Sequence, residues 1–342
     1  MGFRWCQRRG ADVAEGLPAG ETVEMALLSP KDSAEWDAFV QSSRAPHFYN
    51  ETAFFEHYRH NVRSLHPLVF RRKGRIVATI PFGLAERDGQ VELRSPFSSS
   101  FSGFSHQGIA LADAYRCMER VMALAKDLGA GSIVIQQPPV VYCREPDDVW
   151  DFVSHAFGFR LAAWDLSYWV PVSDEFLAGI SGSTRWAINR NERRGLTFEE
   201  EPDLLAAYDF VAQSRLESRL TLSMSRADME QLGERFGDRI HCARVRFEGR
   251  TLAVSINYLM SPWAALCMFW ARSQGDGDVE EVRPLDFLIT RYVMWLHTKG
   301  FGVYDFGTTS INGVPVWGVT QYKEKFGVRG ALRRRLVKDL QP

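Results

Sequence analysis

Asp305 is the acidic residue that the sequence places best for chemistry. It lies in the predicted strand 303–306 and is followed by Gly307. Side chains near the carboxyl end of a strand commonly line a cleft, where a carboxylate can accept a proton or orient a reacting amine. In the alternative interpretation the carboxylate is structural and caps the loop 308–312. The sequence leaves both roles of Asp305 open.

The patterns of a covalent or metal-dependent mechanism are missing from the sequence. There is no Gly-x-Ser-x-Gly motif and no plausible Cys/His nucleophile context. His57 and His60 are one helical turn apart, but Arg59 between them would repel a cation and no cysteine joins them. We therefore expect neither a covalent intermediate nor a metal site.

A run of arginines forms the second candidate site. Four positive side chains lie within ten residues: Arg185, Arg190, Arg193 and Arg194. Such a cluster can bind the phosphates of a nucleotide-linked, lipid-linked or tRNA substrate, and we take Arg185 and Arg190 as candidate substrate-binding residues. In the alternative interpretation the run is a solvated helix between domains, balanced by Glu192 and the acidic residues 199–201.

The elements that must position these residues alternate between strands and helices. Hydrophobic periodicity predicts strands at 23–28, 67–72, 76–84, 91–95, 132–136 and 161–170, then at 239–247, 251–259, 264–271, 303–306 and 331–337. It predicts the main helices at 113–128, 147–157, 203–219, 226–235, 284–298 and 319–326. Because the strands come in hairpins, we expect an α/β fold of mixed sheets with packed helices.

The chain repeats one part of this pattern. Residues 71–79 and 246–254 match at Arg71/Arg246, Gly74/Gly249, Arg75/Arg250 and Ala78/Ala253, and each copy reads as a hairpin. A helix, a Gly-x-Gly segment and a new strand follow each copy at nearly the same separation. This long, single repetition predicts a duplicated domain, although two ordinary hairpins can also share turn chemistry.

The repeat suggests domain bounds. Residues 1–20 are polar and without periodicity, so we expect a disordered tail. The first domain is then expected at 21–173 and the second at 174–342, with the basic helical sequence opening the second.

Composition is typical of a globular protein in a reducing compartment. Of 342 residues, 45% are hydrophobic and 24% charged, and the net charge of −1 gives no case for a large DNA-binding surface. The five cysteines are scattered without a Cys-x-x-Cys pair, as expected for free thiols in a cytoplasmic protein. The apolar stretch 251–270 contains a Ser-Pro pair, so we interpret it as two strands and not a membrane span.

The carboxyl-terminal motifs resemble those of a known family. The matching segments are Tyr304-Asp305-Phe306-Gly307, Gly313, Gly318 and Tyr322-Lys323-Glu324-Lys325-Phe326-Gly327. Together with the basic run at 185–195 and the helix 284–300, they look like the closing part of FemABX-like acyltransferases of the GNAT superfamily. The resemblance extends over most of residues 30–330 and implies tandem GNAT-like domains.

The resemblance assigns roles to further residues. It implies that Lys323 stabilises the negative charge that develops on the attacked carbonyl, a role in which a preorganised cation lowers the barrier. In the alternative interpretation Lys323 is a solvated lysine, as Lys325 nearby would be. Tyr304 and Phe326 in the same motifs are candidate substrate-binding residues.

A possible donor loop follows the strand 264–271. Arg272, Gly275 and Gly277 match the R-x-x-G-x-G pyrophosphate loop of acyl-CoA-binding GNAT proteins, so they are candidate cofactor-binding residues. Acidic residues at 276, 278, 280 and 281 would repel a pyrophosphate, and the next helix is expected only at Pro284. The segment is therefore also interpreted as an acidic surface loop.

These observations and the resemblance lead to one functional hypothesis and one rival. The resemblance implies transfer of an acyl or aminoacyl group to an amine on a cell-envelope precursor, such as a polysaccharide or peptidoglycan intermediate. Its co-substrate would be acyl-CoA, an acyl-carrier protein or aminoacyl-tRNA, without a metal. The rival is a non-catalytic module that binds a glycan or peptide on the same fold.

Overall fold

The computed structural model describes residues 17–18, 22–274 and 282–340. Nearly all of the expected tail 1–20, and both Gly275 and Gly277, lie outside the described residues. The chain forms two compact units. The first comprises Met1–Trp164 with Leu332–Pro342, and the second Asp165–Ala331.

The first unit contains a mixed sheet. Its strands follow the order β1 (Glu24–Leu27), β2 (Ser64–Arg72), β3 (Arg75–Arg87), β4 (Gln90–Ser95), β5 (Ser132–Ile135) and β14 (Arg329–Asp339). The pair β4–β5 is parallel and the other neighbours are antiparallel. The parallel pair requires a crossover, which a helix supplies.

Helices cover both faces of this first sheet. They are α1 (Ser33–Gln41), α2 (Thr52–His57), α3 (Leu111–Asp127) and α4 (Val149–Ala156). One core joins α3 and α4 to the sheet, and a second core joins α1 and α2 to β2. In α3 the buried residues Met118, Val121 and Ala125 recur at helical spacing, which explains why this segment packs as a helix.

The second unit repeats this architecture. Its strands follow the order β6 (Arg160–Pro171), β11 (Val303–Thr308), β10 (Ala264–Arg272), β9 (Arg250–Leu259), β8 (Ile240–Phe247) and β7 (Thr197–Glu200). In the described part of this sheet, β10 and β11 pair in parallel and the other neighbours are antiparallel. A small hairpin, β12 (Ser310–Ile311) with β13 (Val314–Pro315), follows β11.

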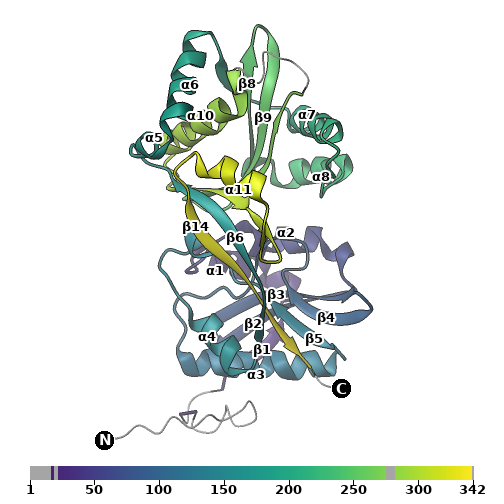
Figure 1. Ribbon diagram of the computed structural model, residues 1–342. Coiled ribbons are helices and arrows are strands. Elements are labelled where there is room, and N and C mark those ends of the chain that lie inside the picture. Colours follow the sequence, from purple (N-terminus) through teal and green to yellow (C-terminus); the bar gives the residue numbers. More distant parts are fainter. Residues whose placement is uncertain (1–16, 19–21, 275–281, 341–342) are drawn as a thin grey trace, which may run out of the picture. The chain divides into compact units, whose positions relative to one another are not determined.

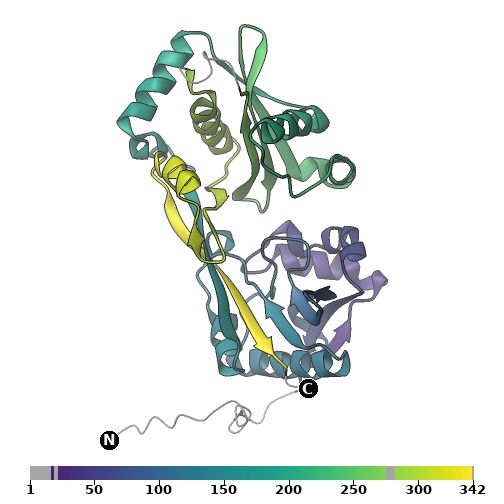
Figure 2. The ribbon, with the colours of Figure 1, turned by 45° about the vertical axis from the view of Figure 1, so that its right-hand side comes forward.

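Helices also cover both faces of the second sheet (Figure 1). They are α5 (Phe176–Gly179), α6 (Gly182–Arg193), α7 (Leu204–Glu217), α8 (Arg226–Phe236), α10 (Pro284–Thr298) and α11 (Trp317–Glu324). One core joins α7 and α8 to the sheet, and another joins α10 to the opposite face. Figure 2 shows α10 and α7 on opposite sides of the strands.

The predicted duplication is confirmed by the topology of the two units. Each has an antiparallel hairpin, a third antiparallel strand, a helix and a strand parallel to the third. In both hairpins the register shifts just before the matching arginine. Arg71 Nη1 donates to the carbonyl of Gly74 at 3.0 Å, and Arg246 Nη2 donates to that of Gly249 at 2.7 Å. The matching residues therefore make the same turn twice.

The bounds of the units differ from those of the expected domains. The expected division at residue 174 lies inside the second unit, because β6 passes from one unit into the other. Residues 332–342 were expected in the second domain but belong to the first unit, where Leu336 and Val337 pair with Ile135 and Val134 of β5. Strand propensity alone does not reveal which sheet a strand joins.

The apolar stretch 251–270 forms the strands β9 and β10, as expected. Met260 and Ser261 donate backbone hydrogen bonds to the carbonyl of Ala264 in the turn between these strands. In the described part of the chain, the helices are too short or too polar to cross a bilayer.

Candidate functional site

The predicted catalytic residues lie where the parallel strands β10 and β11 stop pairing. The register joins residues 264–266 to 303–305, although β10 continues to Arg272 and β11 to Thr308. On its other side, β11 shifts register against β6 between Asp305 and Thr308. Carboxyl ends of parallel strands commonly form ligand sites in α/β folds, because their backbone groups become available there.

Lys323 is buried at this place. It lies on α11 and is 5% exposed. Its Nζ donates to the carbonyl oxygens of Gly307 at 2.9 Å and Thr308 at 2.8 Å. A buried ammonium group needs such partners, since removal from water is costly for an unpaired charge. Lys323 is therefore a fixed cation at the end of β11, and the interpretation as a solvated lysine is wrong.

Lys325 differs from Lys323 although both belong to the same motif. It is exposed, and its Nζ lies 5.0 Å from the ring centroid of Tyr322. The helical rotation of about 100° per residue separates the two side chains onto different faces of the turn. Lys325 is thus a matched control for the charge of Lys323.

Asp305 has a structural hydrogen bond within the turn that precedes the loop 308–312. It is fully buried, and its Oδ1 accepts the backbone N–H of Gly307 at 2.7 Å. This bond closes the turn in which Gly307 has a φ of 76°. A further role of Asp305 as proton acceptor stays a prediction.

Cys267 lies within electrostatic reach of both predicted catalytic residues. Burial raises the pKa of its thiol, and Asp305 contributes to the increase. A hydrogen bond with Tyr304 and the charge of Lys323 lower this pKa in part. The structure thus brings Lys323 and Asp305 together around β10. The thiol stays protonated near neutral pH, so Cys267 is a poor nucleophile.

Tyr322, Asp286 and Arg283 form a hydrogen-bonded group that holds α11 against α10. The sequence did not predict this group. The Tyr322 hydroxyl donates to Asp286 Oδ1 at 2.8 Å, and the Arg283 guanidinium forms an ion pair with the same carboxylate. Burial raises the pKa of Tyr322, as does the charge of Asp286, while Arg283 and Arg272 oppose the increase. The only sequence signal for this group was the adjacency of Tyr322 to Lys323.

The candidate cofactor residues are only partly described. Arg272 ends β10 and acts electrostatically on Tyr322, and Arg283 precedes α10. Two cations therefore flank the segment that contains Gly275 and Gly277. The expected start of the helix at Pro284 is confirmed. Whether this segment binds a pyrophosphate stays a prediction.

The candidate substrate-binding residues fall into two groups. Arg185 and Arg190 lie on α6, where Arg185 Nη2 donates to the carbonyl of Ala178 at 3.0 Å and Arg190 lies over the Trp186 ring. Tyr304 and Phe326 are fully buried in the core of the second unit. Their contact with a substrate stays a prediction.

Tyr304 fixes β11 within a polar network. Its hydroxyl donates to Asn257 Oδ1 at 2.5 Å and accepts from Trp270 Nε1 at 3.0 Å. Burial raises the pKa of this phenol well above its ordinary value. Tyr304 therefore positions the strand that carries Asp305 and does not act as an acid or base near neutral pH.

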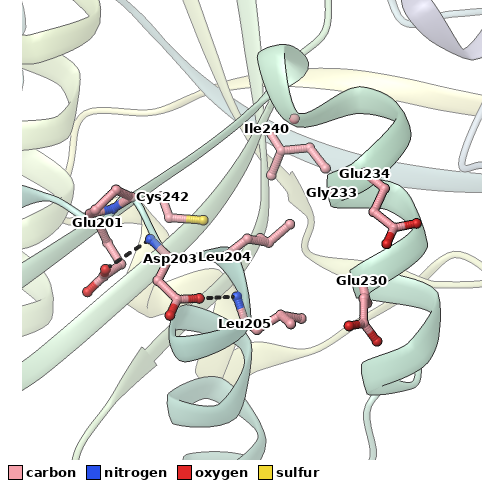
Figure 3. Close-up of a pocket in the computed structure, with 11 residues that line it drawn as sticks. Glu201, Asp203, Leu204, Leu205, Glu230, Gly233, Glu234, Ile240 and Cys242 are labelled. Atoms are coloured by element: carbon pink, nitrogen blue, oxygen red, sulfur yellow. Dashed lines mark hydrogen bonds between the residues drawn. The ribbon is translucent and has the colours of Figure 1, made fainter.

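A pocket of about 660 Å³ in the second unit is separate from the Lys323 site. Figure 3 shows that it is lined by the carboxylates of Glu201, Asp203, Glu230 and Glu234. Its residue Cys242 packs in the core beneath α7 and α8, whereas Phe326 packs in the core beneath α10. Since Asp203 also caps α7, with Oδ1 accepting from Leu205 N at 2.9 Å, part of this acidity stabilises a helix.

Comparison with solved structures agrees with this architecture. FemX is 12% identical over 93% of this chain and 97% of that chain, with a TM-score of 0.70. The C-terminal domain of a putative lysylphosphatidylglycerol synthetase from Agrobacterium fabrum is 15% identical, with 90% and 91% covered and a TM-score of 0.56. A tandem GNAT protein from the clavulanic acid biosynthesis pathway is 12% identical, with 94% and 99% covered and a TM-score of 0.53.

The chain has a FemABX-like tandem GNAT fold. No protein-family model matches its sequence, and no curated protein does so. At these identities the structural likeness establishes the fold and leaves the reaction to the site itself.

Proposed function

We propose that this protein transfers an acyl or aminoacyl group to an amine and that Lys323 stabilises the oxyanion of this reaction. The observation that carries the proposal is the buried ammonium group, held 2.8–2.9 Å from two carbonyl oxygens where β10 and β11 separate. A fixed cation needs no reorganisation when charge develops in the transition state. The resemblance of the carboxyl-terminal motifs to FemABX-like acyltransferases supports this reaction class, and the fold shared with FemX agrees with that resemblance.

The reaction requires few protein groups. The acceptor nitrogen attacks the acyl carbonyl carbon, a C–N bond forms, and the carbonyl oxygen gains negative charge beside Lys323. The bond to the leaving thiolate or ribose oxygen then breaks, and the amine proton passes to a base. Asp305 is the proposed base or orienting group. Its bond to Gly307 N uses Oδ1, and the second carboxylate oxygen would have to serve the acceptor.

The donor is proposed as acyl-CoA, acyl-carrier protein or aminoacyl-tRNA. Arg272 supplies positive charge at the end of β10, which suits the phosphates of each of these donors, whereas the guanidinium of Arg283 is paired with Asp286. The tandem GNAT structure is of the form without AcCoA, and the Agrobacterium protein is named for an aminoacylated lipid. The proposed acceptor is an amine on a cell-envelope precursor, which would be a small or lipid-linked molecule.

Native mass spectrometry of the purified protein tests this proposal. The protein is incubated in turn with acetyl-CoA, palmitoyl-CoA, a charged tRNA and a muramyl-peptide glycan. A specific complex with one donor, weakened by Arg272→Gln, is expected because that guanidinium would face donor phosphates. Binding of the glycan alone, with every donor failing, would replace acyl transfer by the glycan-binding alternative.

A further inference from the structure

Helix α6 presents an exposed tryptophan within its arginine cluster. Trp186 is 60% exposed, and Arg190 and Arg193 follow it at the spacing that places residues on one face of a helix. The opposite face carries Ala187 and Ile188, which are buried against the core of the second unit. The outward position of the indole is thus set by the orientation of the whole helix.

The cationic groups are arranged around this indole. The Arg190 guanidinium carbon lies 5.2 Å from the ring centroid of Trp186, a cation–π geometry. Glu192, the acidic residue of α6, forms an ion pair with Arg291 of α10 at 2.5 Å. The negative charge of Glu192 is therefore compensated by Arg291, and the positive charges of the arginines on α6 are not reduced by it.

An apolar side chain lies beside this ion pair. Met294 of α10 is 37% exposed, and its Sδ accepts a hydrogen bond from Arg291 at 3.6 Å. The surface thus combines guanidinium groups with apolar area. We call it the α6 surface and define it by Trp186, Arg190 and Arg193.

We propose that the α6 surface binds the headgroup layer of a membrane that contains anionic lipids. Guanidinium groups bind lipid phosphates bidentately, and a tryptophan ring is favoured at the depth where headgroups meet acyl chains. Each cation near an anionic leaflet adds about 1 kcal/mol of attraction, and the effect is confined to the membrane surface. Such binding would bring the second unit to lipid-linked molecules without any membrane-spanning helix.

An extended nucleic acid fits the same surface less well. Binding along a polyphosphate chain needs basic residues over a long track, whereas the chain as a whole has a net charge of −1. A headgroup layer needs only the compact patch that α6 provides.

Co-sedimentation of the full-length protein with vesicles tests the proposal. We compare phosphatidylcholine vesicles with vesicles of phosphatidylcholine and phosphatidylglycerol, at low and high salt. The protein is expected to bind the anionic vesicles and to lose this binding in high salt, because exposed charges are screened. The assay contains no acyl donor and needs no turnover, so its result is independent of whether the proposed reaction is correct.

Matched variants distinguish binding through the α6 surface from non-specific binding of the protein to vesicles. Arg193→Gln is expected to weaken partitioning about fivefold, the equivalent of about 1 kcal/mol per cation near an anionic surface. Trp186→Ala is expected to weaken it about tenfold, because a large apolar side chain is no longer inserted. Arg235→Gln on α8 and Trp164→Ala, whose indole is 51% exposed, are the controls and should bind as the parent does.

Three results would overturn the proposal. One is absence of binding to anionic vesicles, and another is equal binding by Arg193→Gln, Trp186→Ala and their controls. The third is a gel-shift of tRNA that depends on Arg193 and Trp186 while vesicle binding does not, which would assign the surface to RNA. Melting curves verify that each variant is folded, as expected for exposed positions.

Discussion

At the residue scale, the candidate site depends on how a charge can be kept inside the protein. Lys323 is buried because Gly307 and Thr308 turn their carbonyl oxygens towards it. Phe326, three residues later, is also fully buried, and its backbone N–H donates to the carbonyl of Lys323 at 3.1 Å. In this environment a charge acts over a short distance with little screening, which is what oxyanion stabilisation requires.

Sequence reasoning could identify Lys323 but not its surroundings. The motif marked the residue, but its burial and its carbonyl partners became evident only in the structure. Asp305 was ambiguous because a carboxylate followed by glycine suits both catalysis and an Asx-turn. Tyr322, Asp286 and Cys267 were missed, since their association depends on the packing of α10, α11 and β10, which no local pattern encodes.

His47 in the first unit gives a prediction on pH at the same scale. Its ring is buried, with its centroid 5.1 Å from that of Phe101, and burial lowers its pKa to about 3, partly opposed by the Ser102 backbone. Between about pH 6.5 and 3, the unfolded chain takes up a proton at this residue and the folded chain does not. His47 therefore destabilises the fold as the pH falls, by about 2 kcal/mol from pH 7 to 5.

Urea unfolding of the parent and of His47→Phe at pH 7 and 5 tests this. The variant should lose less stability than the parent on acidification, by about 2 kcal/mol. Comparison within one background removes the contribution of other histidines. An identical loss in both proteins would show that His47 is protonated equally in the folded and unfolded states.

At the element scale, the duplicated hairpin shows which parts of a sequence encode structure locally. Lys73 and Gly74 have φ values of 51° and 74°, and Glu248 and Gly249 have 48° and 78°. Two successive left-handed residues make the turn that matches the twist of a hairpin, so turn chemistry and repeat coincide. This is why the strands of both hairpins could be predicted closely.

Gly249→Ala tests this turn. Nothing lies within 4 Å of the added methyl group, so its effect comes from the left-handed backbone and should cost about 1 kcal/mol of unfolding free energy. Gly182→Ala is the control, because that position is also open and begins α6, where alanine is neutral or stabilises by about 0.5 kcal/mol. Denaturant titration measures both. A similar change in unfolding free energy for both variants would mean that the left-handed backbone at Gly249 does not account for the cost of the substitution.

Elements defined by tertiary contacts were less predictable. The hairpin β12–β13 is short and exposes Ile311 and Val314, so it lacks the alternation that marks a half-buried strand. Strand β11 extends beyond its predicted end to Thr308, because Thr308 pairs with Ser167 of β6. This pairing joins residues that are far apart in the sequence, so no local pattern predicts it.

At the scale of the whole molecule, the last strand makes the first unit depend on the end of the chain. Leu336 and Val337 are buried and pair with β5, and the Arg334 guanidinium bonds Asp151 of α4 at 2.7 Å. Residues 332–342 follow the second repeat along the chain, so the sequence predicts them in the second domain. The return of a strand to an earlier sheet is a long-range event that requires the folded structure.

Truncation after Ala331 tests this dependence. Loss of the buried Leu336 and Val337 and of the pairing with β5 should destabilise the first unit by at least about 4 kcal/mol, enough to unfold it. Limited proteolysis should then degrade residues 22–160 faster than in the parent. The matched truncation that starts at Glu21 should leave the melting curve unchanged, because residues 1–20 show no hydrophobic periodicity with which to form a packed helix or strand. An intact first unit in the chain 1–331 would contradict this account.

The central claim is that the second unit catalyses acyl transfer with Lys323 as its oxyanion partner. Steady-state turnover of Lys323→Ala and Lys325→Ala, with the donor identified by native mass spectrometry, tests it most directly. Lys323→Ala should lower kcat about 100- to 1,000-fold with little change in KM, because the charge acts mainly in the transition state. Lys325→Ala should retain the parent rate, and melting curves should show both variants folded at the assay temperature. Equal, small effects from the two substitutions would contradict the claim and leave Lys323 as a structural clamp on β11.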